Sequence, residues 1–217
     1  KDPRGEQIIV AVGNKSISNF ALYPPNTTAK GTFENIAQAS NNTPEKLMQA
    51  LLSETSFEWT KHNSIGGEIK PKKSEYYAKM KSMDKAKNYY ALRCKWTFEA
   101  AGSVYAIVKF DFVQQDGQRA TGAYTLVKKN NRWYKHEKAY TTNTCLLFIA
   151  FKDQALKALF EAKPTDNPIH NALLTAISTP NGIDLDKLFG IYDAWKKGKD
   201  DAQINYFLDP TSWINQK

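Results

Sequence analysis

Apolar and polar residues alternate along neighbouring segments in the middle of the chain. In the first, residues 89–99, Tyr, Leu, Cys, Trp and Phe fall on one side and Arg, Lys, Thr and Glu on the other. The second, residues 104–113, follows an Ala-Gly-Ser turn, and the third, residues 121–129, follows Asp116-Gly117. A two-residue period broken by turn residues is typical of strands with one buried and one solvated face. The pattern therefore predicts an antiparallel meander.

Helical spacing of apolar residues replaces this alternation on both sides of the meander. Before it, Thr43 has the features of an N-cap and Pro44 those of a first helical residue, which predicts an amphipathic helix to about Ser56. After Tyr140 the period becomes about 3.6 residues, which is typical of helices packed on a core. The predicted C-terminal helices are residues 151–162, a helix opened by Asn167-Pro168, a helix from the cap Asp184 to Gly198, and residues 200–208.

Two further segments show shorter patterns. Residues 1–42 have no sustained period and are expected to be a loosely structured N-terminal segment, with a short strand from Gln7 to Val12. Tyr76 to Met83 alternates and is predicted to be the first strand of the sheet. Because Lys79 and Lys81 fall on one side of it, we expect an edge strand, where lysine prevents unwanted pairing.

The predicted helix and the curved sheet after it resemble the nuclear-transport-factor-two-like, or cystatin-like, cone superfamily. The resemblance covers residues 43–138 and ends in the run GAYTLVKKNNRWY at residues 122–134, which looks like the closing strand pair of many such domains. It implies an α+β fold in which a curved antiparallel sheet wraps an N-terminal helix and leaves an open apolar mouth. Members of the superfamily include isomerases, dehydratases, cyclases and binding or scaffold domains, so the fold does not select a function.

The chain is accordingly divided into three parts. Residues 1–42 are the N-terminal segment, residues 43–140 the cone-like α+β domain, and residues 141–217 a helical C-terminal subdomain packed on it. This tail departs from the minimal family pattern and could plug the mouth of the cone. At 217 residues and 41% hydrophobic content, the chain is long enough to bury a sizeable core.

The net charge of +8 is concentrated in and just before the meander. Residues 61–95 carry ten basic and three acidic side chains, and residues 96–138 carry seven and four. Such a field favours an anionic macromolecule as a partner. The alternative is that these lysines keep the outer faces and edges of the sheet soluble. The candidate binding residues in this region are Lys79, Lys81, Arg93, Lys95 and Trp133.

The cysteines, Cys94 and Cys145, have neither the spacing of a zinc site nor that of a redox motif. A disulfide between them is an open alternative to buried thiols, because such a bridge forms in an oxidising compartment. No apolar run approaches the roughly 18 residues of a membrane span, so no integral membrane segment is expected. The chain starts at Lys1 rather than Met, which favours an extracytoplasmic location, periplasmic or secreted, after removal of a leader.

Residues with catalytic or metal-binding chemistry are sparse. His62, His136 and His170 lack a second ligand at helical spacing and are expected at the surface, so neither a metal nor a cofactor is predicted. No catalytic residue is assigned, and the candidates are Asp111 in the second strand and His136. Lys109 lies on the same face as Asp111, which predicts that this face is solvated, whereas a proton-shuttling carboxylate needs burial.

These observations predict a non-catalytic extracytoplasmic binding or scaffold protein. Its expected partner is a small molecule or an anionic macromolecule, and a homodimer through the sheet is a further prediction. The first alternative is a cone-family enzyme or carrier that acts on an apolar small molecule by acid–base chemistry. The second is a single-strand nucleic-acid binder, because Tyr and Trp residues are interleaved with lysine around the meander. Packing of these rings in the core is the competing interpretation.

Overall fold

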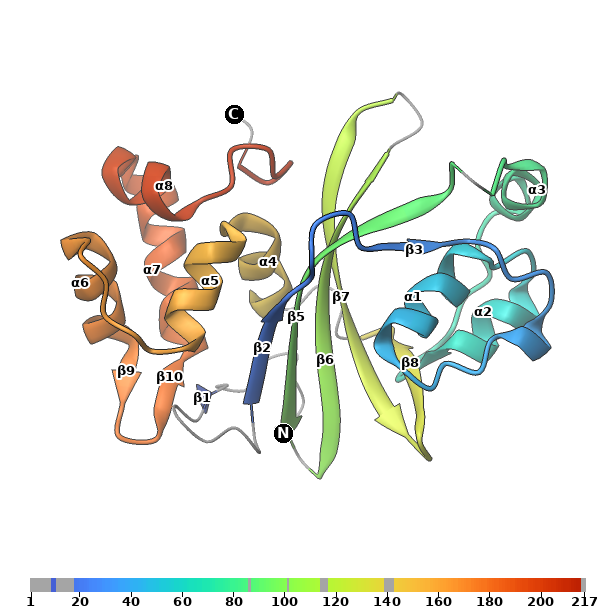
Figure 1. Ribbon diagram of the computed structural model, residues 1–217, viewed down its shortest axis with the longest axis horizontal. Coiled ribbons are helices and arrows are strands. Elements are labelled where there is room, and N and C mark those ends of the chain that lie inside the picture. Colours follow the sequence, from blue (N-terminus) through green and yellow to red (C-terminus); the bar gives the residue numbers. More distant parts are fainter. Residues whose placement is uncertain are drawn as a thin grey trace.

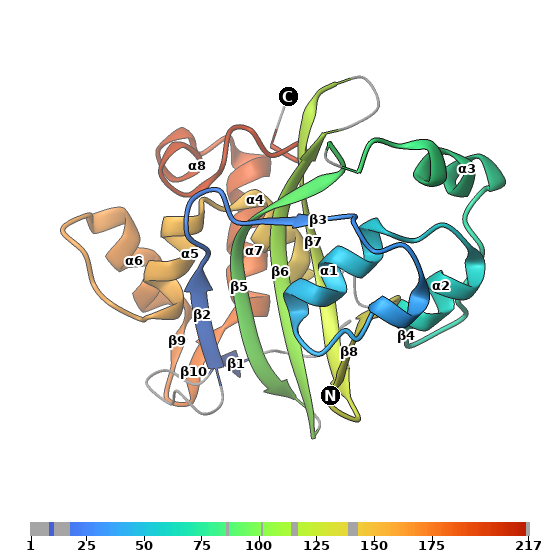
Figure 2. The same cartoon turned by 45° about the vertical axis from the view of Figure 1, so that its right-hand side comes forward.

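The computed structural model describes residues 9–10, 18–85, 87–100, 102–113, 117–138 and 143–215. The chain has a mixed α+β architecture in which a large sheet lies between helices on both of its faces (Figure 1). The helices on one face are α1 (Pro44–Leu52), α2 (Phe57–Asn63) and α3 (Ser74–Ser82). Those on the other side are α4 (Asn143–Ala150), α5 (Asp153–Phe160), α6 (Pro168–Ile177), α7 (Leu185–Gly198) and α8 (Asp201–Phe207). Figure 2 shows α1 lying across the central strands.

The large sheet has the strand order β2-β5-β6-β7-β8-β4, and β3 pairs with a further part of β5. Neighbouring strands are antiparallel except for β4 and β8, which are parallel. The strands are β2 (Ser18–Leu22), β3 (Thr28–Lys30), β4 (Ser64–Ile65), β5 (Tyr89–Ala100), β6 (Ser103–Val113), β7 (Arg119–Lys129) and β8 (Arg132–His136). A smaller sheet joins β1 (Ile9–Val10), β10 (Gly182–Asp184) and β9 (Ser178–Thr179). The predicted meander is confirmed as β5, β6 and β7.

Helix starts follow the capping signals in the sequence. The side chain of Thr43 accepts a hydrogen bond from the backbone N–H of Lys46, and Pro44 is the first residue of α1. Asn167 caps α6 and Asp184 caps α7 in the same way. Such caps satisfy backbone N–H groups that a helix start leaves without partners. The predictions of these helix starts are confirmed.

The prediction of an edge strand at Tyr76 to Met83 is wrong, because this segment is helix α3. Tyr76 and Met80 are four residues apart and both turn inward, while Lys79 and Lys81 are exposed. The alternating lysines gave the segment a false two-residue period. The first strand of the meander is joined instead by strands from the N-terminal segment, where β2 and β3 pair with β5. Of the short strand predicted from Gln7 to Val12, Ile9–Val10 forms β1, and the rest lies outside the described residues.

A β-bulge in β5 reverses which of its side chains point to each face of the sheet. Leu92 pairs with Phe110 and Cys94 with Lys109, so Arg93 has no Cα partner on β6, a strand that is described throughout. One inserted residue transfers the side chains beyond it to the opposite face. Leu92 therefore packs on the α1 side, whereas Cys94 and the apolar residues after it pack on the side of the C-terminal helices.

Hydrophobic cores consequently lie on both faces of the sheet. The core on the α1 side contains Leu47, Met48 and Phe110. The core on the other side joins Trp96 to apolar residues of α4 and α5, among them Phe148. Each such buried side chain contributes about 1.5–3 kcal/mol to stability. The C-terminal helices thus cover the sheet face opposite α1 and do not enter the space between α1 and the sheet.

Candidate functional site

The residues proposed from sequence to bind a partner do not form one surface. Lys79 and Lys81 are exposed on α3. Lys95 is paired with Glu45 of α1 at 2.7 Å, and Trp133 is buried in the core on the α1 side. Arg93 lies on the opposite face of the sheet, within an ion-pair network. The sheet therefore separates Arg93 from the other four side chains, and the charges of Lys95 and Arg93 are compensated by carboxylates.

The network around Arg93 corrects the expectation that the face of Asp111 is solvated. Lys109 is fully buried, and its ammonium group donates to the backbone carbonyl of Phe151 and lies 2.8 Å from Asp153. The guanidinium of Arg93 contacts Asp111 at 3.3 Å and also pairs with Asp153 and Asp209. The C-terminal helices cover much of this face, and carboxylates from α5 and from the segment after α8 neutralise the buried Lys109 and the partly buried Arg93. Asp111 is thus engaged in a structural ion pair.

The histidines and cysteines are also placed by the structure. His136 is half-buried at the end of β8, and its ring is tilted by 47° against that of Tyr105, with the ring centroids 6.3 Å apart. His170 is fully buried and hydrogen-bonded to the carbonyl of Lys163, so its expected surface position is wrong. Cys94 and Cys145 are buried thiols that no disulfide joins, which removes the alternative of a bridge between them. Burial raises the pKa of the Cys94 thiol to about 12.

Polar side chains from distant parts of the chain converge between α1, α2, α3 and the sheet. They enclose a space that we call the α1-face cavity, with a volume of about 30 Å³. This is room for about one or two water molecules. Its lining residues are Leu51, Glu54, Thr60, Ser64, Lys72, Tyr76, Tyr90, Tyr124, Lys135 and Glu137. Buried polar groups need hydrogen-bonding partners, and a small-molecule site uses such groups to orient its ligand. We therefore take this concentration of polar groups as the candidate site.

The helical wall of the cavity is built on Glu54, which follows the C-terminal end of α1. Its side chain is 1% exposed, and its carboxylate lies 2.7 Å from the ammonium group of Lys72. Thr60 and Asn63 of α2 donate hydrogen bonds to the same carboxylate at 3.0 Å. Lys72 donates to the hydroxyl of Tyr76 and lies 4.2 Å from the centroid of that ring. Charge and hydrogen-bonding capacity are therefore matched around Glu54.

Lys72, Tyr76 and Tyr90, which line the cavity, each keep one protonation state around neutral pH. Burial alone lowers the pKa of Lys72, but the Glu54 carboxylate outweighs it and holds the pKa above its usual range. Burial raises the pKa of Tyr76 and of Tyr90 above the ordinary value of 10.0. Lys72 therefore stays charged, and both phenols stay neutral. These groups present hydrogen-bond donors to the cavity and do not exchange protons readily.

The opposite wall comes from the sheet. Lys135 of β8 lies 3.3 Å from Glu137, and Ser64 of β4 donates a hydrogen bond to Glu137 at 2.7 Å. The parallel pairing of β4 with β8 places Ser64 opposite Lys135. The ammonium group of Lys135 is 5.0 Å from the centroid of the Tyr124 ring. This wall therefore also carries a lysine and a carboxylate.

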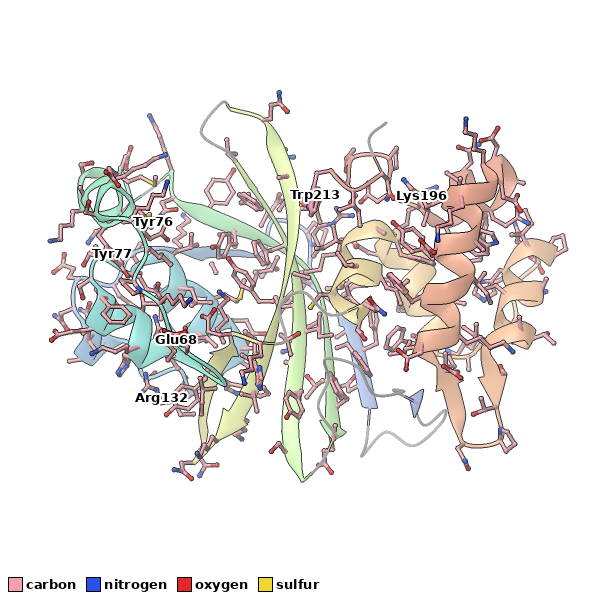
Figure 3. The ribbon with its side chains drawn as sticks, turned by 180° about the vertical axis from the view of Figure 1, so that it is seen from behind. Glu68, Tyr76, Tyr77, Arg132, Lys196 and Trp213 are labelled. Atoms are coloured by element: carbon pink, nitrogen blue, oxygen red, sulfur yellow. The ribbon has the colours of Figure 1, made fainter. Side chains whose placement is uncertain are left out.

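Helix α3 covers the cavity and is attached mainly by polar contacts. Of its residues, all of which the structure describes, Met80 alone is buried. The hydroxyl of Tyr77 contacts Thr60 at 2.9 Å and accepts a hydrogen bond from the backbone of Lys72. Figure 3 shows Tyr76 and Tyr77 on α3, at the end of the molecule remote from Lys196 of α7. Because α3 buries little apolar surface, we expect it to be among the less stable parts of the fold.

Sequence reasoning did not find this site. Glu54, Lys72 and Glu137 lie far apart along the chain, and none belongs to a recognisable motif. The local signal for it is the Tyr76-Tyr77 pair beside lysines, whose alternation favours a strand although the segment forms helix α3. The four-residue spacing of Tyr76 and Met80 instead indicates one face of a helix that packs on the rest of the protein.

Comparisons with protein-family models, curated proteins and solved structures return no match to this chain. The resemblance to the cone superfamily therefore stays a prediction. Within the described ranges, no cluster of three or more His, Cys, Asp or Glu side chains is arranged to hold a metal ion. In the same part of the chain, no helix combines the length and apolar character needed to cross a membrane.

Proposed function

We propose that this protein is a non-catalytic binding protein whose small polar ligand occupies the α1-face cavity. The observation that supports it most is the buried carboxylate of Glu54, paired with Lys72 at the cavity wall. Burial of a charged pair is often less favourable than apolar packing of the same volume, so a binding role is a reason to retain it. Convergent polar groups around a covered space are the usual features of a small-molecule site.

Binding accounts for this chemistry better than catalysis does. General acid–base catalysis needs a group whose pKa lies near the working pH. Lys72, Tyr76 and Tyr90 have pKa values raised away from neutrality. They suit recognition, in which donors and acceptors keep one protonation state.

The resemblance to the cone superfamily supports the same location for the site. In this proposal the space between α1 and the sheet is the mouth of the cone, and α3 is its cover. The extracytoplasmic location and the homodimer through the sheet stay predictions. Cell fractionation tests the first, and size-exclusion chromatography with light scattering tests the second.

A thermal-shift screen tests the proposed function. The full chain is screened against amino acids, sugars, nucleosides and short organic acids, in parallel with a Ser64→Leu variant that fills the cavity. We expect at least one compound to raise the melting temperature of the wild type but not that of Ser64→Leu. Ser82→Leu is the matched control, since Ser82 is exposed on α3, and it should respond like the wild type.

Different results would favour other functions. A panel without any stabilising compound, or one whose hits stabilise Ser64→Leu equally, would overturn binding at the cavity. Chemical turnover of a bound compound, lost in Glu54→Gln, would replace the non-catalytic proposal by the enzyme alternative. Circular dichroism establishes that each variant is folded before it is compared.

A further inference from the structure

The α1-face cavity is lined by charges of both signs in equal number among its described residues. Lys72 and Glu54 stand on the helical wall, and Lys135 and Glu137 on the sheet wall. The net formal charge of the lining is therefore zero when the lysines are protonated and the carboxylates ionised. A ligand complementary to such a lining is itself neutral overall.

The ion pairs of the opposing walls differ in how tightly they are made. The ammonium group of Lys72 lies 2.7 Å from Glu54, within the range of a strong charge-assisted hydrogen bond, and Glu54 also accepts from Thr60 and Asn63. The ammonium group of Lys135 lies 3.3 Å and 3.4 Å from the oxygens of Glu137. The sheet-side pair is thus longer than a strong charge-assisted hydrogen bond.

We infer that the ligand of this cavity is a small zwitterion of the α-amino acid class, which inserts at the Lys135–Glu137 pair. This inference rests on the proposed function. The ligand carboxylate would take a position against Lys135 and its ammonium group one against Glu137. Opposite charges then alternate around the site, and each protein charge keeps a partner.

Ligands with one charge or none fit this arrangement less well. An anion that pairs with Lys135 would draw it from Glu137, whose side chain is 22% exposed and would lose part of its compensation. A cation at Glu137 has the same effect on Lys135, which is 16% exposed. An uncharged polyol cannot compensate either group when it separates them. The cost of weakening the compensation of a partly buried charge therefore selects for a molecule that brings both signs.

The small volume of the covered cavity limits which ligands can enter and how. At about 30 Å³, the covered cavity accepts water but not an amino acid, so binding requires outward movement of α3. Met80 is the one buried residue of this fully described helix, and the hydroxyls of Tyr76 and Tyr77 add polar contacts to it. Small side chains, as in glycine and alanine, need the smallest displacement.

Isothermal titration calorimetry of the full chain tests the inference, with glycine as the probe. Acetate, methylammonium and glycerol, at the same millimolar concentrations, supply one charge, the opposite charge and none. We expect saturable heat with glycine and none with the other three. Glu137→Gln should weaken glycine binding about tenfold or more, because it removes one pole of the pair. Glu161→Gln is the matched control, because Glu161 is also paired with lysines but lies on the other side of the sheet. It should leave glycine binding unchanged.

The outcomes separate this inference from the proposed function. Acetate or methylammonium binding as tightly as glycine, or Glu137→Gln binding glycine like the wild type, would overturn the zwitterion. If glycine and alanine are silent while another class of the screen stabilises the protein through the cavity, the inference fails and the proposed function stands. A silent screen overturns both. Should Glu137→Gln fail to fold, Lys135→Gln removes the other pole of the same pair and decides the matter.

Discussion

The ammonium group of Lys109, on the central strand β6, lies 2.8 Å from a carboxylate oxygen of Asp153 in the first turn of α5. Asp153 also accepts a hydrogen bond from Arg93 at 2.8 Å. A carboxylate in the first turn of a helix is favoured by the helix dipole as well as by its cationic partners. This contact therefore ties the layer of C-terminal helices to the sheet by charge, in addition to the apolar core.

Removal of Lys109 should be strongly destabilising. Lys109→Ala leaves the partly buried Asp153 and the buried Asp209 with Arg93 as their cationic partner, so we expect a loss of about 3–5 kcal/mol in the free energy of unfolding. Urea denaturation followed by circular dichroism measures it. Lys129→Ala, at an exposed position of β7, is the matched control and should change stability by less than about 0.5 kcal/mol. A loss below about 1 kcal/mol for Lys109→Ala would show that the network contributes little.

Stability should fall in acid through Asp209. Burial acts to raise the pKa of this carboxyl, but hydrogen bonds from Thr211 and Arg93 hold it below its ordinary value of 3.8. A depressed pKa in the folded state gives stability that is present above 3.8 and is lost as the pH falls through the folded pKa. The stability difference between wild type and Asp209→Asn should therefore shrink between about pH 4 and pH 2.

Urea unfolding at a series of pH values measures this difference. Asp193→Asn is the control, because Asp193 is half exposed and pairs with Lys197 one helical turn away. Such a surface pair contributes little, so its variant should follow the wild type at every pH. An Asp209→Asn curve parallel to the wild type would contradict the role given to Asp209.

Replacing glycine by alanine should lower the stability of the protein at Gly66 and raise it at Gly190. Gly66 has a φ of +90°, and a Cβ there would lie 2.7 Å from the His136 ring, so Gly66→Ala should destabilise by about 1–3 kcal/mol. A Cβ at Gly190, inside α7, would meet nothing within 4 Å apart from its flanking residues and the backbone of its own helix, so Gly190→Ala should stabilise by about 0.5–1 kcal/mol. Thermal unfolding by calorimetry compares them. Equal effects would mean that the turn at Gly66 relaxes freely.

Local signals in the sequence were sufficient for much of the fold. Thr43 and Asp184 indicate helix starts because a capping side chain accepts a hydrogen bond from a backbone N–H only three residues further on. Alternation located β5, β6 and β7 because it depends on neighbouring side chains. The bulge at Arg93 left no such trace, since alternation in the sequence continues through it while the backbone changes face.

Features that depend on distant residues could not be predicted. Lys109 is buried because Asp153 and Asp209 arrive from the C-terminal part of the chain to neutralise it. A lysine in a strand reads as solvent-facing until those partners are known. The candidate site follows the same logic, because Glu54 and Glu137 meet around one cavity only after α1 and β8 have been placed on the sheet.

The bulge at Arg93 also bears on how the molecule comes apart. Because β5 contributes Leu92 to the core beside α1 and Cys94 to the core beneath the C-terminal helices, one uninterrupted backbone belongs to both. Neither core can be dismantled without withdrawing part of the same strand from the other. The two faces of the sheet are therefore coupled in unfolding. A change that destabilises the layer of C-terminal helices should also destabilise the core beside α1, because β5 belongs to both.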